Sequence, residues 1–291
     1  MAPSNGGSNV AHALTLDVED YFQVLNLAAH CPRDRWDDYE LRCPDSTRRF
    51  LDILDEVSVR ATFFCLGWIA ERSPDLIQEI VQRGHELASH GYDHKLLPDL
   101  GADGFREDCR KTRDILEKIG GTTVRSFRAC TWSITSKTPW ALPILVEEGY
   151  TRDSSIHPVR HPDYGVPDAP LGPHLLHPDG KGELFELPPL VADAFGKRLP
   201  LGGGGYLRLF PVRLISRALR GRERRGEPSC IYLHPWELDP EQPRFGVGGL
   251  RGFRHYVGLE KTADKLRWLL TRHRFTTLQD VERTWRETQP A

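Results

Sequence analysis

Short apolar runs and longer amphipathic segments alternate along the first half of the chain. Apolar runs of strand length are found at 12–17, 60–66, 85–89, 124–128 and 149–153. Segments with apolar positions at helical spacing lie between them, at 46–57, 74–83 and 105–119. Gly84, Gly120 and Gly149 stand where such helices should end. Strands that alternate with helices predict a parallel sheet.

The second half of the chain has a less regular pattern. Residues 158–182 are rich in Pro, His, Gly and Asp, which predicts a long irregular segment over the catalytic face. Regular structure resumes at 184–187, 206–210, 211–222 (a basic helix), 230–233 (an apolar strand), 259–272 (a helix), 275–277 (a strand) and 278–286 (a helix). Seven or eight strands with intervening helices predict an α/β fold of the distorted (β/α) barrel type, in which catalytic groups gather at the C-terminal strand ends.

The composition narrows the class of protein. The chain has 291 residues and 39% hydrophobic residues, enough for one domain over 1–291. Its 39 basic and 41 acidic residues give no sign of a nucleic-acid surface. The polar first residues lack the pattern of a signal peptide and no run is long enough to span a bilayer, so we expect a cytoplasmic protein. Six cysteines without a CxxC pair predict buried, reduced thiols.

Two carboxylates follow the first predicted strand. Because strand side chains alternate, Asp17 and Glu19 point to the same side, near the mouth of the barrel. A solvated acidic loop is the simpler interpretation of such a cluster. The apolar strand before it and Tyr21 and Phe22 after it favour a functional site instead.

Two histidines follow the third predicted strand. His90 and His94 are four residues apart, so one helical turn would place both imidazoles on the same face. Two histidines and a carboxylate hold a divalent ion such as zinc and leave one position open for water or substrate. A pair of ordinary surface or core histidines is the alternative, which the nearby carboxylates disfavour.

Three further polar residues stand at strand ends. Arg128 is placed to hold a catalytic carboxylate by paired hydrogen bonds. His234 follows the apolar strand 230–233 and is expected to donate a proton to a leaving group. Asp153 is the expected group that orients His234 and keeps it protonated. Trp132 and Trp236 are candidates for stacking on sugar rings.

A competing metal site is conceivable in the irregular segment. Its ligand-type residues are His157, His161, Asp163, His174 and His177. Pro158 and Pro162 disfavour a helical pairing of the first two histidines, so we interpret these residues as loop. The run Gly202 to Gly205 lacks the Lys-Ser/Thr ending of a phosphate-binding loop and is interpreted as a flexible or tight turn.

These residues together resemble a known family. The acidic group after strand one, Ser-His-Gly-Tyr-Asp-His at 89–94, Arg128, Asp153 and His234 stand in the order of the five motifs of NodB-homology polysaccharide deacetylases, carbohydrate esterase family 4. The fuller pattern at 17–24 and 232–244 is similar to the branch found in bacterial exopolysaccharide loci. That branch has an extra C-terminal segment, which would lie within 155–291.

The resemblance implies roles for individual residues. Asp17 would be the general base, His234 the general acid, and His90 and His94 metal ligands together with one carboxylate. Alternation favours Glu19 as that carboxylate, whereas residue type favours Asp20. Cys-Thr at 130–131 replaces the family's frequent Pro-Tyr, and Thr131 is our candidate for the backbone donor of an oxyanion hole. The implied cofactor is one divalent ion, Zn²⁺ by preference and otherwise Co²⁺, Ni²⁺ or Mn²⁺.

The resulting prediction is an enzyme that hydrolyses linear amides. It would remove N-acetyl groups from N-acetylglucosamine-type units of a polysaccharide or its precursor, with a glycan or a lipid-linked amino sugar as partner. Two alternatives remain: a metal-dependent hydrolase of another small amide, and a glycan-binding protein without catalysis. The sequence leaves the oligomeric state open.

Overall fold

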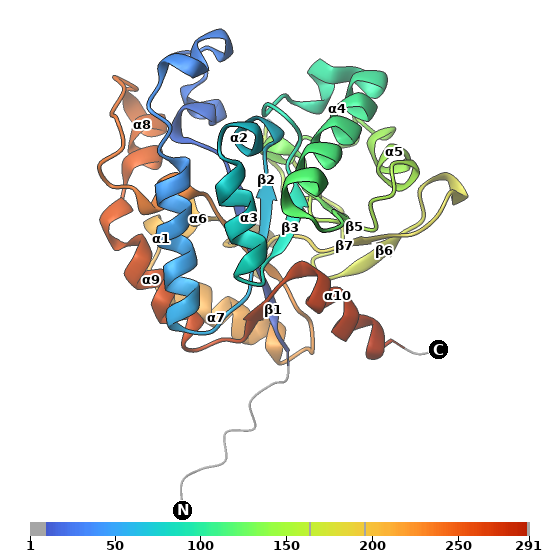
Figure 1. The fold of residues 1–291 in the computed structure, drawn as a ribbon. Helices are drawn as coiled ribbons and strands as arrows, with labels where there is room; N and C mark the ends of the chain where they lie inside the picture. Colours follow the sequence, from blue (N-terminus) through green and yellow to red (C-terminus); the bar gives the residue numbers. More distant parts are fainter. Residues whose placement is uncertain (1–9, 163, 195, 290–291) are drawn as a thin grey trace, which may run out of the picture.

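The fold is built around one curled, largely parallel sheet (Figure 1). The computed structural model describes residues 10–162, 164–194 and 196–289. The strands of this sheet are β1 (His12–Val18), β2 (Thr62–Cys65), β3 (Glu86–Ser89), β4 (Ser126–Phe127), β5 (Arg152–Asp153), β6 (His174–Leu176), β7 (Leu184–Glu186), β10 (Cys230–Leu233) and β11 (Phe275–Thr276).

The strand order places the first strand inside the sheet. The path runs β10-β1-β2-β3-β4-β5-β7-β6, and β11 pairs with the beginning of β1. All these pairs are parallel except β6 with β7. Among the described residues the path of named strands is not closed into a ring, although isolated parallel bridges join Pro189 to Cys230 and Gly203 to Tyr232 of β10, so the fold is a barrel-like curled sheet. The predicted α/β class and distorted barrel are confirmed.

Helices surround the sheet, and α1, α3 and α4 stand side by side along it in Figure 1. The α-helices are α1 (Cys43–Glu56), α2 (Gly67–Arg72), α3 (Pro74–Gln82), α4 (Leu97–Gly120), α5 (Ala141–Glu147), α6 (Gly204–Leu209), α7 (Val212–Glu223), α8 (Gly249–Tyr256), α9 (Thr262–Leu270) and α10 (Leu278–Glu287). Among the described residues, no helix combines the length and the apolar character that crossing a membrane requires.

Short elements account for most differences from the sequence prediction. Residues 206–210 belong largely to helix α6, and the helices α2, α5 and α8 were not anticipated. The hairpin of β8 (Val191–Ala194) and β9 (Lys197–Pro200) was also missed. The segment 158–182 is mainly irregular, as predicted, although it includes strand β6.

Burial explains why β1 carries the chemistry. All seven residues of β1 are buried because strands flank it and helices cover it, so its polar residues must find partners inside the protein.

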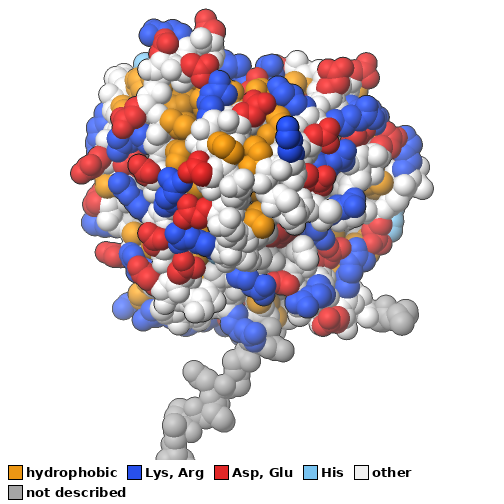
Figure 2. All heavy atoms as spheres, in the orientation of Figure 1, with side chains coloured by type: hydrophobic (Ala, Val, Ile, Leu, Met, Phe, Trp, Pro, Cys, Tyr) orange, Lys and Arg blue, Asp and Glu red, His pale blue; other side chains and the backbone are white. Residues whose placement is uncertain are grey.

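All six cysteines are buried and unpaired, as predicted. The surface is different in character: Figure 2 shows basic and acidic side chains interspersed over one face, in keeping with the near-zero net charge.

Candidate active site

An ion pair lies at the carboxyl end of β1. Nη1 of Arg128 donates to Oδ1 of Asp17 at 2.6 Å, and both side chains are almost fully buried. The guanidinium also donates to the hydroxyls of Thr15 and Ser154 and to the carbonyl of Ser154. These donors fix Arg128, which in turn holds the Asp17 carboxylate in one orientation.

The side chains of the other two acidic residues, Glu19 and Asp20, point to different partners. Oε2 of Glu19 lies 2.7 Å from Nε2 of His94. Asp20 turns away, and its carboxylate accepts backbone N–H groups of Tyr21, Arg42 and Cys43 at 2.7–2.8 Å. Glu19, which the alternation argument favours, therefore faces the histidines, whereas the oxygens of Asp20 anchor the following loop, so Glu19 stays the candidate ligand.

The two histidines meet without a helix. The segment after β3 is irregular, and His94 has a left-handed backbone with φ of 58°. The predicted helical turn is therefore wrong, yet the two imidazole centroids of His90 and His94 lie only 5.8 Å apart. Positive φ at a non-glycine residue costs energy and persists where the surroundings enforce it.

These donors fit a divalent cation. Nδ1 of His90 is hydrogen bonded to the Arg128 carbonyl at 2.8 Å, which makes Nδ1 the protonated nitrogen and leaves the lone pair on Nε2. Burial lowers the pKa of His90 to about 4, so the ring is neutral. Burial opposes the charge of Glu19, but the facing His94, His234 and His90 outweigh it and lower its pKa to about 2. Two imidazoles beside one buried carboxylate are a typical donor set for zinc.

The Cys130 thiol is a weaker candidate ligand. Its Sγ lies within 4.8 Å of ring nitrogens of His90 and His94. However, it donates to the His90 carbonyl at 2.9 Å, and burial raises its pKa well above the usual range. Cys130 thus remains a protonated thiol, which agrees with the prediction that the cysteines are buried and reduced.

His234 faces the acidic residues across the site. Its Nε2 lies 4.0 Å from Oδ2 of Asp17 and 3.6 Å from Oε1 of Glu19. Its Nδ1 lies 3.2 Å from Oε2 of Glu237, which also accepts the backbone N–H of His234. Burial lowers the pKa of His234, but Glu237, Glu19 and Asp17 together raise it to about 9. The ring is therefore protonated at neutral pH and suited to donate a proton.

The group that contacts His234 is not the predicted one. The described side-chain partners of Asp153 are Ser155 and Glu186, and burial raises its pKa to about 6. We therefore correct the prediction that Asp153 orients His234: the carboxylate of Asp153 is engaged by Ser155 and Glu186, and Glu237 contacts Nδ1 of His234 instead. Glu237 is itself held by Nε of Arg208 at 2.8 Å.

Sequence reasoning missed both Glu237 and Arg208. A signal for Glu237 was present, since a glutamate three residues after His234 can reach back in the manner of a capping box, and the structure has this arrangement. Arg208 gave no comparable signal, because it comes from helix α6 and meets Glu237 only in the folded chain.

Aromatic and strained residues line the same region. Trp236 stacks on the ring of His234 at 5.1 Å, and its Nε1 donates to Glu19 at 3.4 Å. Thr131 and Trp132 both have left-handed backbones, with φ of 53° and 55°. Trp132 is buried, and the guanidinium of Arg128 lies 4.9 Å from its ring. Thr131 and Trp132, with their strained backbones, thus lie beside the candidate catalytic residues, and such strain is often found at active sites.

The alternative histidine cluster does not assemble. Among the described residues, ligand-type side chains gather in two groups, and neither includes His157, His161, His174 or His177. His157 is buried against Trp132, and His161 stacks on Tyr164. Asp163 lies outside the described residues.

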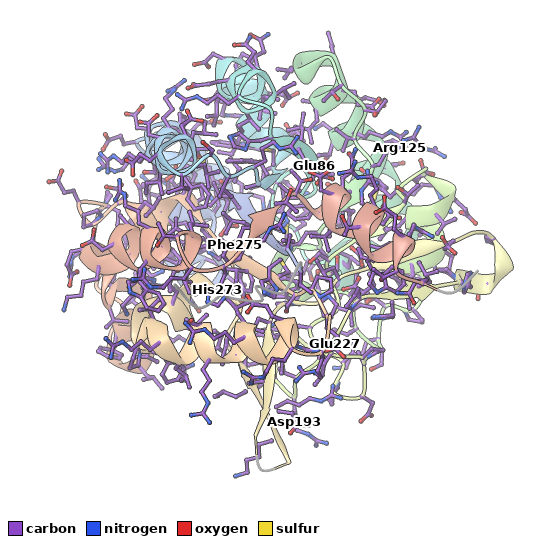
Figure 3. All side chains as sticks on the ribbon, turned by 90° about the horizontal axis from the view of Figure 1, so that it is seen from below. Glu86, Arg125, Asp193, Glu227, His273 and Phe275 are labelled. Carbon is purple, nitrogen blue, oxygen red and sulfur yellow. The ribbon has the colours of Figure 1, made fainter. Side chains whose placement is uncertain are left out.

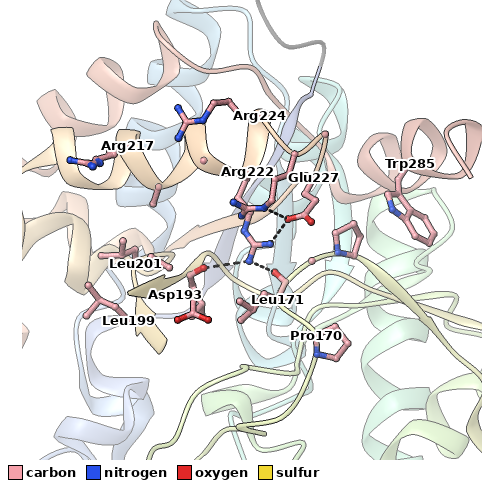
Figure 4. A pocket seen from close by; sticks show the side chains of 18 of the residues that line it. Pro170, Leu171, Asp193, Leu199, Leu201, Arg217, Arg222, Arg224, Glu227 and Trp285 are labelled. Carbon is pink, nitrogen blue, oxygen red and sulfur yellow. Dashed lines mark hydrogen bonds and ion pairs between the residues drawn. The ribbon is translucent and has the colours of Figure 1, made fainter. Parts of the chain in front are cut away.

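A large cavity lies apart from these residues. It has a volume of about 1360 Å³ and is lined by α7, the β8–β9 hairpin and the end of α10 (Figure 4). Arg222 crosses it and is paired with Glu227 at 2.6 Å and with the carbonyl of Leu171. None of the candidate catalytic residues lines this cavity.

Comparison with known proteins agrees with this geometry. Residues 35–150 match the family model for polysaccharide deacetylases. The chain carries a polysaccharide deacetylase domain. Residues 154–283 match a second model, a domain of unknown function named DUF3473. The deacetylase resemblance and the extra C-terminal segment are thereby confirmed, and the candidate site draws residues from both parts.

Individual relatives match part of the chain. The peptidoglycan-N-acetylglucosamine deacetylase of Bacillus cereus is 35% identical over 82 residues, which are 28% of this chain and 30% of that protein. The chitooligosaccharide deacetylase of Sinorhizobium fredii is 45% identical over 90 residues, 30% of this chain and 40% of that protein. The matches thus span less than half of these relatives.

Solved structures share the fold. A candidate polysaccharide deacetylase from Mycobacterium smegmatis has a TM-score of 0.64 and 22% identity, covering 100% of this chain and 97% of its own. Puue allantoinase has the same TM-score at 16% identity, covering 99% and 93%. At these identities the likeness establishes the barrel-like fold of the deacetylase domain.

Proposed function

We propose that this protein hydrolyses the N-acetyl group of N-acetylglucosamine-type units in a polysaccharide or its precursor. The observation that carries the proposal is the opposition of a base and an acid: Oδ2 of Asp17 lies 4.0 Å from Nε2 of His234. The named relatives act on peptidoglycan and chitooligosaccharides, which are N-acetylated glycans. An exopolysaccharide or a lipid-linked amino sugar is the substrate that we propose.

The first chemical step uses Asp17. Held as a carboxylate by Arg128, it accepts a proton from the attacking water while the water oxygen bonds to the acetyl carbon. The backbone N–H of Thr131 is the proposed donor to the oxyanion that forms, and Trp132 is proposed to hold the sugar. Trp236 is not available for this role, because its buried ring already stacks on His234 and His255.

The second step uses His234. Its imidazolium donates a proton to the amide nitrogen as the C–N bond breaks, which yields acetate and a free amine. Glu237 keeps the ring charged and oriented for this transfer. Asp153 has no part in this step, because its carboxylate contacts Ser155 and Glu186.

His90, His94 and Glu19 are the residues proposed to hold one divalent ion, preferably Zn²⁺. When bound, such an ion polarises the amide carbonyl and stabilises the charge that develops on its oxygen. The burial of Glu19 beside these imidazoles supports the assignment, since two histidines and one carboxylate would hold a divalent ion and leave a position open for water or substrate.

The decisive experiment measures acetate release from N-acetylglucosamine oligomers. We expect Asp17→Asn to lower kcat by about 10²–10⁴-fold, as loss of a general base does. A chelator should abolish activity, and added Zn²⁺ should restore it. Asp38→Asn, which removes an exposed carboxylate, is the matched control and should retain activity. Activity that survives both the chelator and Asp17→Asn contradicts the proposal.

A further inference from the structure

A segment that is rich in arginine and has no acidic residue lies near His234, the candidate general acid. Residues 244–254, which we call the α8 rim, contain three arginines and no acidic residue. Arg244, Arg251 and Arg254 are exposed. Two large apolar side chains in helix α8 are also exposed, Leu250 at 62% and Phe253 at 54%, and they lie one helical turn apart. Large apolar groups exposed together among cations mark an interaction surface.

The α8 rim is fastened to the catalytic residues. The ring of His255, at the end of α8, stacks on Trp236 at 4.5 Å, and Trp236 stacks on His234. Nη1 of Arg208 donates to the carbonyls of His255 and Val257 at 2.8 and 2.9 Å. Arg208 therefore holds both the end of α8 and Glu237. In Figure 1, α8 lies toward the end of the molecule at which the β2 arrow points.

The rim itself is closely packed on its inner side. A Cβ on Gly252 would lie 1.9 Å from the carbonyl oxygen of Val247, so the preceding loop lies directly against α8. Phe245, in the same loop, stacks on Tyr21 at 6.1 Å. The exposed side chains are thus carried by a supported element that has one buried and one outward side.

We propose that the α8 rim docks the protein on an anionic lipid surface, next to the catalytic mouth. Leucine and phenylalanine enter the boundary between headgroups and acyl chains, and arginines pair with anionic headgroups. A polysaccharide fits less well, because Leu250 has no flat ring to stack on a sugar and is the more exposed of the two apolar residues. Resting on the proposed function, the docked site faces an amino sugar that is linked to a lipid.

The test is cosedimentation of the full chain with vesicles. We expect binding to vesicles of phosphatidylcholine with about 30% phosphatidylglycerol, and much weaker binding to phosphatidylcholine alone, because the arginines need anionic lipid. Arg251→Gln with Arg254→Gln should weaken binding by about fivefold per arginine. Leu250→Ser should weaken it by about tenfold, the effect of withdrawing an aliphatic side chain.

A matched control lies on another helix. Arg217 and Arg220 of α7 are exposed and carry the same charge, so Arg217→Gln with Arg220→Gln changes net charge equally away from the rim. This double variant should bind vesicles like the parent chain. Circular dichroism of each variant establishes that it is folded.

Several results overturn the proposal. These are equal binding to neutral vesicles, loss of binding in the α7 control, and a dimer in light scattering that Leu250→Ser dissociates. Retention on immobilised chitin oligomers that the rim variants lose, without vesicle binding, would identify a glycan surface instead. Acetate release without vesicle binding refutes the docking alone, whereas vesicle binding without acetate release refutes the proposed function alone.

Discussion

The charge of the partly buried His234 depends on two buried side chains behind it, Glu237 and Arg208. Arg208 pairs with Glu237 at 2.8 Å, and Glu237 contacts Nδ1 of His234 at 3.2 Å. Burial opposes the charge of Glu237, but Arg208 and His234 lower its pKa, so it remains a carboxylate. A buried carboxylate with a cation on each side is favourable only while all three groups are present.

Replacing Glu237 is therefore expected to affect catalysis through pH. An imidazolium acid is active below its pKa, so activity of the parent chain should fall as pH rises through about 9. Glu237→Gln removes the negative charge that raises the pKa of His234, so this fall in activity should occur at lower pH. The measurement is the pH profile of kcat/KM for acetate release.

Two comparisons make this prediction specific to Glu237. Glu237→Asp keeps the charge and should retain part of the shift, and Glu241→Gln removes an exposed carboxylate from the same segment. If kcat/KM of Glu237→Gln falls at the same alkaline pH as that of the parent chain, Glu237 supports only the local structure.

At the residue scale, the sequence predicted the members of the site better than their partners. Asp17 and Glu19 were predictable because strand alternation fixes which side chains share a face. The contact between Asp17 and Arg128 was also anticipated. The partner of His234 was not, because Asp153 and Glu237 both fit the required chemistry and only the contacts of the folded chain separate them.

At the scale of elements, the glycines at the start of α6 have a packing role. A Cβ on Gly203 would lie 2.5 Å from the hydroxyl of Tyr232, and one on Gly204 would lie 1.8 Å from Oε2 of Glu237. The sequence interpretation of this run as a flexible or tight turn is incomplete, because backbone sits directly against the carboxylate that supports His234. A pattern of glycines alone does not reveal what approaches them.

Adding one methyl group should destabilise the protein at Gly204 and have little effect at the neighbouring Gly205. Gly204→Ala would push the Glu237 carboxylate from its place, so we expect loss of stability of about 1–3 kcal/mol, as for overpacking, together with reduced acetate release. Gly205→Ala meets only Nη2 of Arg208 at 3.7 Å, an ordinary contact, and is the matched control. Urea unfolding and activity assays compare the two, and equal behaviour would refute the packing role.

A second polar cluster joins β1, α7 and the turn before β11. Glu223 accepts from Nδ1 of His273 at 2.6 Å and lies 3.4 Å from Nε2 of His12. Nδ1 of His12 accepts the backbone N–H of Ser229, so the proton of its neutral ring is on Nε2 and points to Glu223. The cluster, which we call the clasp, thus combines a hydrogen bond from His273 with a polar contact from His12. His273 and Phe275 mark its location in Figure 3.

The clasp should stabilise the fold in a pH-dependent way. The interactions with His12 and His273 outweigh burial and lower the pKa of Glu223 to about 2, below the value of about 4.3 in an unfolded chain. Its contribution is therefore present above about pH 4.3 and is lost as pH falls toward 2. We expect Glu223→Gln to lower the free energy of unfolding by about 1–2 kcal/mol near neutral pH.

Urea unfolding at several pH values measures this difference. The gap between Glu223→Gln and the parent chain should be constant near neutral pH and should narrow in acid. Glu260→Gln, at an exposed glutamate, is expected to show no gap. A gap that is independent of pH would mean that Glu223 acts through shape and not through its charge.

At the scale of the whole molecule, the site exists only where distant segments meet. Asp17 precedes the matched deacetylase region, His90, His94 and Arg128 lie inside it, and His234 lies in the DUF3473 part. The sheet also combines strands from both matched parts, because β1 pairs with β2 from the deacetylase part and with β10 and β11 from the later part. Sequence order predicted the class of fold, whereas which strands are neighbours follows only from the assembled sheet.

This arrangement predicts a single cooperative unit over the chain, although two family models divide it. Residues 1–153 alone would leave β1 without β10 and β11 and expose its fully buried side chains, so we expect that fragment not to fold. For the full chain, tryptophan fluorescence and far-ultraviolet circular dichroism should give coincident urea transitions, because the seven tryptophans extend from Trp36 to Trp285. Two separate transitions, or a folded fragment with native-like near-ultraviolet signal, would mean that the deacetylase part folds independently and that the later segment merely completes its site.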